Sequence, residues 1–384
     1  MQILATRRDF LQTAASAGVA MALGGRNTRA AESDAFSFVL LGDLHYDKLE
    51  HHDMGWLERN KAGDLSQIRN YSRITADLMP RLFATVRETI VDRSHSHARP
   101  AFVLQVGDLV EGLCGTEALA VRQDTEALEF VRSSGLGVPF VFTKGNHDVT
   151  GDGAIEAFNH VCAPFLREQS AALGGDGILT GASYALERGG ALFCFFDAYD
   201  KQSLDWLEAA LAKRTARHCF VVIHPPVVPY GARSTWHLFG NARDAARREK
   251  LLGMLGRQNA FVLGGHIHRY NTLTRTTPGS GRFVQLAVSS VVPALEVAPK
   301  TELSGIQEYT GDQIRVEPAH SPGTETERRA VYDAERHSVT TFQYADLPGY
   351  AVVTVRSDGV VAEVYAGASR RLWKTASLSA LLEA

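Results

Sequence analysis

Seven short runs of mostly apolar residues recur along the chain, and several are separated by longer segments with helical spacing. The runs are continuous rather than alternating, as expected for strands that are covered on both faces. They occupy residues 36–43, 102–108, 140–148, 191–200, 219–226, 260–268 and 282–290. The segments that favour helices are residues 71–92, 117–133, 203–215 and 242–257. Alternating strands and helices predict an α/β fold.

The C-terminal part of the chain departs from this pattern. Residues 350–367 predict a β-hairpin that turns at Asp358-Gly359. Residues 300–345 are polar and include Pro318, Pro322 and Gly323, which predicts a long loop or insertion. No internal repeat and no glycine-rich phosphate-binding loop is found in the sequence.

The first 30 residues have the three regions of an export signal. Paired arginines, Arg7-Arg8, precede a mild apolar stretch from Ala14 to Leu23, and Thr28-Arg29-Ala30 follows. This order resembles a twin-arginine signal peptide cleaved after Ala30. It predicts use of the twin-arginine export machinery, a periplasmic or secreted location, and a single mature domain over residues 31–384. The alternative is a cytoplasmic amphipathic N-terminus.

Composition narrows the class of protein. The chain has 384 residues, is 45% apolar and has no uninterrupted apolar run long enough to span a membrane, so no stable membrane insertion is expected. Its net charge of −3 becomes more negative once the arginine-rich signal is removed, which argues against a nucleic-acid partner. The basic tract from Arg243 to Lys250 predicts a solvated helix face. The four cysteines are not spaced like the ligands of a metal site and are predicted to be buried and unpaired: Cys114, Cys162, Cys194 and Cys219.

Polar side chains of metal-ligand type follow five of the seven apolar runs. These strand ends carry Asp43 and His45, Asp108, Asn146 with His147 and Asp148, His224, and His266 with His268. In open α/β sheets, ligands bind at the carboxyl ends of strands. Residues i and i+2 of a strand share a face, so each D-x-H or H-x-H pair is spaced to reach one point. The residues predict a convergent polar cluster rather than isolated turns.

The ordered motifs D-x-H, G-D, G-N-H-D, H and G-H-x-H, over residues 43–268, resemble those of the calcineurin-like metallophosphoesterase family. The resemblance implies a four-layer α/β/β/α sandwich with two metal ions at the strand ends. It implies that one metal is held by Asp43, His45 and His268. The other would be held by Asn146, His224 and His266, with Asp108 bridging. His147 would then act on the leaving group, held in place by Asp148.

The donor set agrees with such a centre. Imidazole, carboxylate and amide ligands suit Mn, Fe or Zn better than Mg or Ca. Two divalent ions, offset by Asp43, Asp108 and one bridging hydroxide, leave a charge of about +1 that attracts a phosphoryl anion. We therefore expect a dimetal phosphoester hydrolase in which metal-bound hydroxide attacks phosphorus in line.

Departures from the family patterns narrow the substrate class. Glu111 stands where purple acid phosphatases have a tyrosine, and the phosphate-binding arginine of the protein Ser/Thr phosphatases is missing from the Gly107–Leu113 stretch. What remains resembles the single-domain group that includes class III cyclic nucleotide phosphodiesterases. We expect a phosphodiesterase acting on a small-molecule phosphoester. A phosphomonoesterase for small organic phosphates and a non-catalytic metal-binding scaffold are the alternatives.

Several neighbouring residues have structural interpretations or are candidates for the substrate pocket. Asp197 ends the fourth run and is interpreted as a structural cap. The pairs His51-His52 and His95/His97 are interpreted as solvated loop residues. Trp236-His237 and Tyr46 are candidates for lining a substrate pocket, and Arg233 is a candidate for supplying the missing positive charge.

Overall fold

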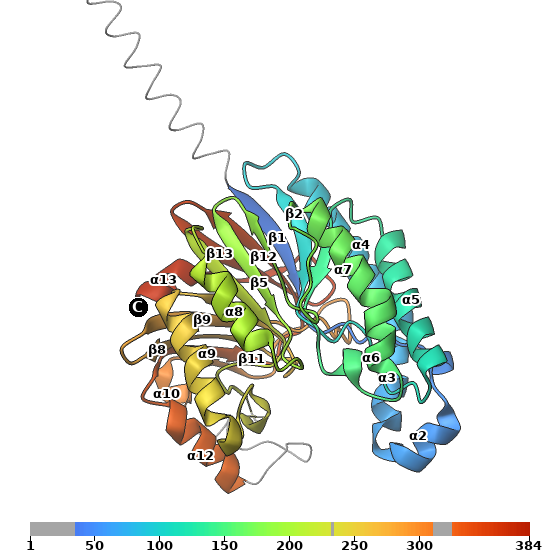
Figure 1. Cartoon of the computed structure of the whole chain (residues 1–384). Coiled ribbons are helices and arrows are strands. Elements are labelled where there is room, and N and C mark those ends of the chain that lie inside the picture. The colour runs from blue at the N-terminus through green and yellow to red at the C-terminus, as the bar shows by residue number, and fades with distance from the viewer. Residues whose placement is uncertain (1–34, 232–233, 310–324) are drawn as a thin grey trace, which may run out of the picture.

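The computed structural model describes residues 35–231, 234–309 and 325–384. Two β-sheets lie face to face at the centre, and helices cover the outer face of each sheet (Figure 1). The predicted α/β/β/α sandwich is therefore confirmed. The predicted signal segment, Arg233, Pro318, Pro322 and Gly323 lie outside the described residues.

The first sheet combines the start and the end of the described chain. Strands β1, β2 and β3 are parallel, and β12 pairs antiparallel with β1 on its other side. In spatial order its strands are β14 (Leu372–Ser377), β13 (Gly359–Ala366), β12 (Gly349–Arg356), β1 (Phe36–Leu41), β2 (Pro100–Gln105) and β3 (Phe140–Phe142). Every residue of β1 is buried, which explains its unbroken apolar sequence.

The second sheet is built from the middle of the chain. Its parallel core is β5, β6, β7 and β9. In spatial order its strands are β10 (Glu302–Ser304), β11 (Val339–Ala345), β8 (Tyr270–Thr277), β9 (Gly281–Ala287), β7 (Phe261–Gly264), β6 (His218–Ile223), β5 (Ala191–Phe196) and β4 (Tyr184–Arg188).

The helices divide between the two outer faces (Figure 1). On the side of the first sheet lie α2 (Met54–Asn60), α3 (Leu65–Asp77), α4 (Met79–Asp92), α5 (Glu117–Ser133), α6 (Ala154–Ala157) and α7 (Ala163–Ala172). On the side of the second lie α8 (Ser203–Ala212), α9 (Ala245–Arg257), α10 (Ile306–Tyr309) and α12 (Glu325–Glu335). Helix α13 (Leu378–Glu383) contacts both sheets, through β13 of the first and β8 and β9 of the second. Helix α4 shows why they pack this way, because its buried Leu82, Phe83 and Val86 recur at helical spacing along one face.

Aromatic rings fill the space between the two sheets. Phe38 of β1 stacks on Phe102 of β2, with ring centroids 5.2 Å apart. It meets Phe193 of β5 edge-on at 5.4 Å, and Phe193 stacks on Phe220 of β6 at 4.6 Å. Offset and edge-on pairs of buried rings stabilise a contact beyond the area they bury. They fix the first sheet against the second.

Two predicted elements are wrong in detail. Residues 71–92 are not one helix, because α3 ends at Asp77 and α4 begins at Met79 with Pro80 in its first turn. Proline cannot donate the backbone hydrogen bond that a continuous helix needs there. The hairpin closes over Ser357-Asp358, because Arg356 pairs with Gly359.

The predicted loop at 300–345 contains regular structure instead. It includes β10, α10, α12 and β11, and β11 pairs with β8 in the second sheet. Only Val339, Phe342 and Ala345 of β11 are fully buried, and polar residues occupy most of the other positions, so the strand has no clear apolar run in the sequence.

Two sets of side chains are more buried than predicted. His51 and His52 are not solvated: His51 is fully buried, and the Nε2 atom of His52 lies 2.7 Å from Asp47 Oδ1. Arg248, within the basic tract, is held inside the fold, because its guanidinium donates to the carbonyl of Val227 and contacts Glu335. His95 and His97 are exposed, as predicted. The four cysteines are buried and free, as expected for small apolar side chains.

Candidate metal centre

The predicted ligand residues meet where strands of both sheets end. Asp43 and His45 follow β1, Asp108 follows β2, Asn146 follows β3, His224 follows β6, and His266 and His268 follow β7. Three of these strands belong to the first sheet and two to the second. The face-to-face packing of the sheets therefore brings residues 225 positions apart in the sequence into one cluster.

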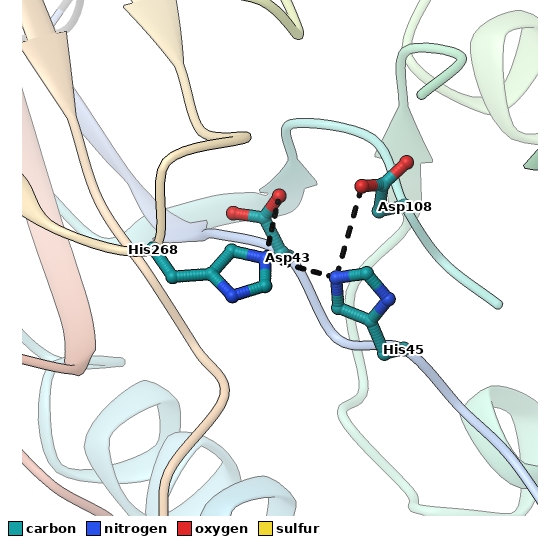
Figure 2. A group of neighbouring side chains, drawn as sticks. All are labelled: Asp43, His45, Asp108 and His268. Carbon is teal, nitrogen blue, oxygen red and sulfur yellow. Dashed lines mark hydrogen bonds and ion pairs between the residues drawn. The ribbon is translucent and has the colours of Figure 1, made fainter. Parts of the chain in front are cut away.

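One group of donor atoms contains Asp43, His45, Asp108 and His268 (Figure 2). The Nε2 atoms of His45 and His268 are 2.9 Å apart. His45 Nε2 lies 3.7 Å from Asp108 Oδ2, and His268 Nε2 lies 3.6 Å from Asp43 Oδ1. All four side chains point toward one another, with one ligand atom from each within 4.8 Å of the others.

A second group shares Asp108 with the first. It contains Asp108, His224 and His266, and Asn146 joins it through its side-chain oxygen. His224 Nε2 lies 3.1 Å from Asp108 Oδ2, 3.2 Å from Asn146 Oδ1 and 3.2 Å from His266 Nδ1. The Oδ2 atom of Asp108 therefore stands between both groups.

Left-handed backbone, rather than the pleat of a strand, aims these side chains. His45, Asp108, His266 and His268 have φ angles of 49°, 56°, 71° and 58°. The strands end before them, so the predicted i, i+2 alternation does not apply. His266 and His268 accordingly reach different groups instead of one point. Such φ values are rare outside glycine and cluster at functional sites.

Two glycines allow the loops to approach the carboxylates closely. A Cβ atom on Gly145 would lie 2.1 Å from Asp108 Oδ1, and one on Gly265 would lie 2.5 Å from Asp43 Oδ2. Both distances are far below van der Waals contact. These two positions require glycine because of close packing against the candidate ligands.

Hydrogen bonds at Nδ1 turn the Nε2 atoms of His45 and His224 toward the centre. His45 Nδ1 lies 2.7 Å from Glu111 Oε2, and His224 Nδ1 lies 2.9 Å from the carbonyl oxygen of Val106. Each Nδ1 therefore donates its hydrogen outward, and each Nε2 faces the centre, where metal binding would release the proton that it carries. Such hydrogen bonds commonly orient histidines that bind metals.

The carboxylates make the centre attractive to positive charge. Burial lowers the pKa of His45, but the hydrogen bond and charge of Glu111 outweigh it and raise that pKa to about 9. Burial likewise lowers the pKa of His224, and the charge of Asp108 outweighs it and raises that pKa to about 9. For His266, burial and the charge of His224 lower the pKa to about 3, so its ring is neutral and ready to bind a metal.

The residues present fit a centre for two divalent metal ions. Among the described residues, Asp43 Oδ2 is a buried carboxylate oxygen with no hydrogen-bond partner, as expected of an atom reserved for a cation. Two facing imidazole nitrogens at 2.9 Å also converge on one point. Mixed imidazole, carboxylate and amide ligands match divalent transition metals.

Asp148 does not hold His147, which corrects the predicted role of this carboxylate. Its Oδ2 accepts from the backbone N–H groups of Asp108 at 3.0 Å and Gly145 at 2.7 Å, and its Oδ1 accepts from Val110 at 3.2 Å. Asp148 therefore fixes the loops that carry the ligands. Its side chain points into the loop instead of toward the neighbouring ring.

Glu111 holds His147 instead, and sequence reasoning missed it. The Nδ1 atom of His147 donates to the backbone carbonyl of Glu111 at 2.7 Å and lies 3.4 Å from its Oε2. The carboxylate is fully buried and also accepts from Gln67 at 2.9 Å. The sequence did offer a signal, because Glu111 is the only charged residue in the stretch after Asp108. In the sequence analysis, however, it served only to distinguish this chain from purple acid phosphatases, which have a tyrosine there.

A pocket of about 800 Å³ opens over the centre. Its walls include Asp108, Asn146, His147, His266 and His268. Aromatic side chains complete it: the Tyr71 ring stacks on His45 at 4.4 Å, and Trp236 lies 5.5 Å from the His266 ring.

The other candidate neighbours take the following places. Trp236 and His237 line the pocket, as considered from the sequence. Tyr46 does not, because it is buried against Phe130. Asp197 is a structural anchor, as interpreted, since it pairs with Lys144 at 2.6 Å and accepts from the backbone of Ala182.

Comparison with known proteins agrees with this arrangement. The profile of the family described as calcineurin-like phosphoesterase matches residues 36–270. No curated protein matches the chain at a significant level. In the described part of the chain, no helix has both the length and the apolar character needed to cross a membrane.

The similar solved structures are distant in sequence. Purple acid phosphatase PPD1 from yellow lupin (Lupinus luteus) seeds has a TM-score of 0.50 and 12% identity, over 89% of this chain and 53% of its own. The present chain thus spans about half the length of that protein. A dimetal phosphatase from Danio rerio has a TM-score of 0.48 and 15% identity, over 89% of this chain and 98% of its own. The structure titled PhoD has a TM-score of 0.48 and 12% identity, over 89% and 68%.

Proposed function

The chain belongs to the calcineurin-like phosphoesterase family, and from this premise we propose that it is a dimetal hydrolase of small phosphodiesters. The observation that carries the proposal is the shared carboxylate of Asp108. Its Oδ2 lies 3.7 Å from His45 Nε2 in one donor group and 3.1 Å from His224 Nε2 in the other. Two sites that share one carboxylate can hold two ions close enough to act on one phosphoryl group.

The metal ligands would be those predicted from the sequence: Asp43, His45 and His268 for one ion, Asn146, His224 and His266 for the other, and Asp108 for both. Bound there, two Mn, Fe or Zn ions would supply a nucleophile at neutral pH and positive charge for the phosphoryl oxygens.

His147 is the residue best placed to assist the leaving group. Its Nδ1 is held by the Glu111 carbonyl, so the ring orientation is set and Nε2 remains to hold a proton. The residue lines the pocket and is not needed in either donor group built around Asp108. A positioned general acid speeds such reactions by roughly 10² to 10⁴.

The charge of the pocket favours diesters over monoesters. In its described lining, Lys61 is the cation beyond the histidines, and no arginine is present. A dianionic monoester needs more compensating positive charge than a monoanionic diester does. The space of about 800 Å³ also exceeds what a bare phosphate needs and leaves room for organic groups beside Tyr71 and Trp236.

The proposal includes export of the protein. Arg7-Arg8, the apolar stretch from Ala14 to Leu23 and Thr28-Arg29-Ala30 support a twin-arginine signal. The enzyme would then act in the periplasm or outside the cell on a small-molecule phosphoester, and its mature domain would start at residue 31.

The test is hydrolysis by metal-free protein reconstituted separately with Mn, Fe and Zn. We expect kcat/KM for bis-nitrophenyl phosphate to exceed that for nitrophenyl phosphate by about tenfold, a difference of about 1.4 kcal/mol in transition-state stabilisation. A preference for the monoester would replace the diesterase assignment with a monoesterase. Two bound metals without hydrolysis across a panel of mono- and diesters would point to a metal-binding scaffold.

A further inference from the structure

A second pocket, of about 420 Å³, adjoins the main pocket. Tyr71 and His268 contribute to the walls of both. His268 also belongs to the first donor group, so the second pocket begins directly beside the candidate metal centre. A phosphodiester carries two ester arms, and one arm can extend into each pocket while the phosphorus stays at the centre.

The second pocket contains two cationic side chains that form no ion pair among the described residues. Arg269 donates from Nη1 to the His268 carbonyl at 2.9 Å, and across the described residues its guanidinium has no carboxylate partner. The ammonium of Lys300 forms no ion pair within the same part of the chain. The lining carboxylate, Asp346, already accepts from the backbone N–H groups of Lys300 at 2.7 Å and Thr301 at 2.9 Å.

Ser289 lines the second pocket and contributes a hydroxyl group that makes no hydrogen bond to the described residues. Its side chain is 2% exposed, and its Oγ has no hydrogen-bond partner among the described residues. It pairs by an isolated β-bridge with Asp43, which places it next to the centre. Buried polar atoms normally have a partner, so a bound group or a water that it orders would complete this one.

Within the described residues, the main pocket has no comparable excess of positive charge from its own cationic side chains. Its charged residues other than the predicted ligands and His147 are Lys61 and Asp64 together with His237, and the carboxylate of Asp64 offsets the ammonium of Lys61. An arm with a negative group is therefore better accommodated beyond His268 than beside Trp236.

We propose that the pocket formed by Arg269, Lys300 and Ser289 is a subsite for an anionic oxygen group, carboxylate or phosphate, on one arm of the substrate. The planar guanidinium of Arg269 suits both groups, because it presents paired donors to two oxygens. The inference rests on the proposed function for the identity of the reacting ester. It deepens that function by naming the substrate class: phosphodiesters with a second anionic group on one arm.

Binding of phosphonates that cannot be hydrolysed tests the subsite independently of catalysis. Calorimetry of the metal-loaded protein would compare ethylphosphonate, 2-carboxyethylphosphonate and 2-aminoethylphosphonate. We expect the carboxylate compound to bind about tenfold more tightly than the ethyl compound, and the ammonium compound more weakly than either. Arg269→Gln and Lys300→Gln should each reduce the carboxyethyl-to-ethyl ratio by about 3- to 10-fold. Lys213→Gln, which removes an exposed cation outside both pockets, should leave the ratio unchanged.

Nitrophenyl diesters with ethyl, carboxyethyl and phosphonoethyl arms extend the test to turnover. The kcat/KM ratio of each anionic ester to the ethyl ester should exceed one and fall in both pocket variants, and the larger ratio identifies the preferred anion. Equal binding of ethyl and carboxyethyl phosphonates, or ratios unchanged in both variants, would overturn the subsite. Preserved selectivity in binding without hydrolysis of any ester would leave the subsite standing and refute the proposed function.

Discussion

Glu111 and His147 are joined by a hydrogen bond of 2.7 Å from the imidazole Nδ1 to the backbone carbonyl oxygen. The same residue places its carboxylate 2.7 Å from Nδ1 of His45, a candidate metal ligand. One buried glutamate therefore orients both the candidate acid and one side of the candidate metal centre. The two roles separate experimentally, because one uses its main chain and the other its side chain.

His147→Ala should retain both metals and lose activity in proportion to the need of the leaving group for a proton. A nitrophenolate leaves without much assistance, whereas an alkoxide requires protonation. We expect kcat/KM to fall by about 10³ to 10⁴ for an alkyl diester and much less for a nitrophenyl ester. Equal losses on both substrates would remove His147 from the acid role.

Glu111→Gln should weaken metal binding while keeping the His147 orientation, because the main-chain carbonyl is unchanged. Loss of the charged acceptor for His45 should lower metal affinity by about 10- to 100-fold. Titration of the metal-free protein with Mn or Zn measures this. Glu129→Gln, an exposed position on α5, is the matched control. Unaltered affinity in the Glu111 variant would show that its carboxylate does not support the centre.

Asp108→Ala should abolish binding of both metal ions, whereas His45→Ala should lower the metal affinity of mainly one site. The reason is that Asp108 belongs to both donor groups and His45 lies with it in the first. Elemental analysis of the purified variants gives the metal content per chain. Two metals retained without Asp108 would refute its bridging role.

Lysine at both Arg7 and Arg8 should leave the precursor in the cytoplasm with residues 1–30 attached. The paired arginines are the recognition feature of the twin-arginine route, and lysine preserves their charge without their geometry. Cell fractionation with mass measurement of the N-terminus reports the outcome. Normal periplasmic accumulation of the variant contradicts the signal assignment.

Glu335→Gln should destabilise the fold at neutral pH far from the candidate centre. Glu335 lies 2.5 Å from Arg248 and 2.7 Å from Arg275. Burial raises the pKa of Glu335, but the charges of both arginines outweigh it and leave that pKa below its ordinary value. Removing one member of such a buried cluster costs about 3 kcal/mol.

The pH dependence of this effect has a definite sign. Because the folded-state pKa is lowered, the carboxylate stabilises the fold above its unfolded pKa of about 4.3. That contribution disappears as the pH falls through the folded-state value. The difference in unfolding free energy between wild type and variant, measured by urea titration, should therefore shrink below about pH 4. Glu208→Gln, which breaks an exposed pair with Lys250, should change little at any pH.

The α/β class was predictable because the central strands are apolar throughout, whereas the four-layer sandwich followed from the family resemblance. Strand β8 was not, because it is buried with polar side chains. Asn271 donates to the Gln343 carbonyl at 2.8 Å, and Arg275 pairs with Glu335. The buried polar side chains of β8 have their partners in β11 and α12, which are distant in the sequence, so the sequence near β8 does not predict the strand. The same reason hid the buried His52, whose partner Asp47 is visible only in the fold.

The candidate ligands were visible in the sequence because each stands directly after an apolar run. Their roles relative to one another were not visible. The assignment of Asp148 to His147 followed from the family resemblance, but the backbone turns the carboxylate toward Asp108 and Val110. Left-handed geometry at His266 and His268 likewise depends on the contacts of the closed loop.

The position of β1 between β12 and β2 means that the sheet carrying Asp43 and Asp108 is assembled only after β12 has been synthesised. The first sheet is incomplete until β12, β13 and β14 have been synthesised, and the second sheet supplies His224, His266 and His268. We expect chains that end before β12 to bind metal more weakly than the folded protein does. Because the metal ions bind only the state in which both sheets have packed together, they would stabilise the tertiary structure once it has formed.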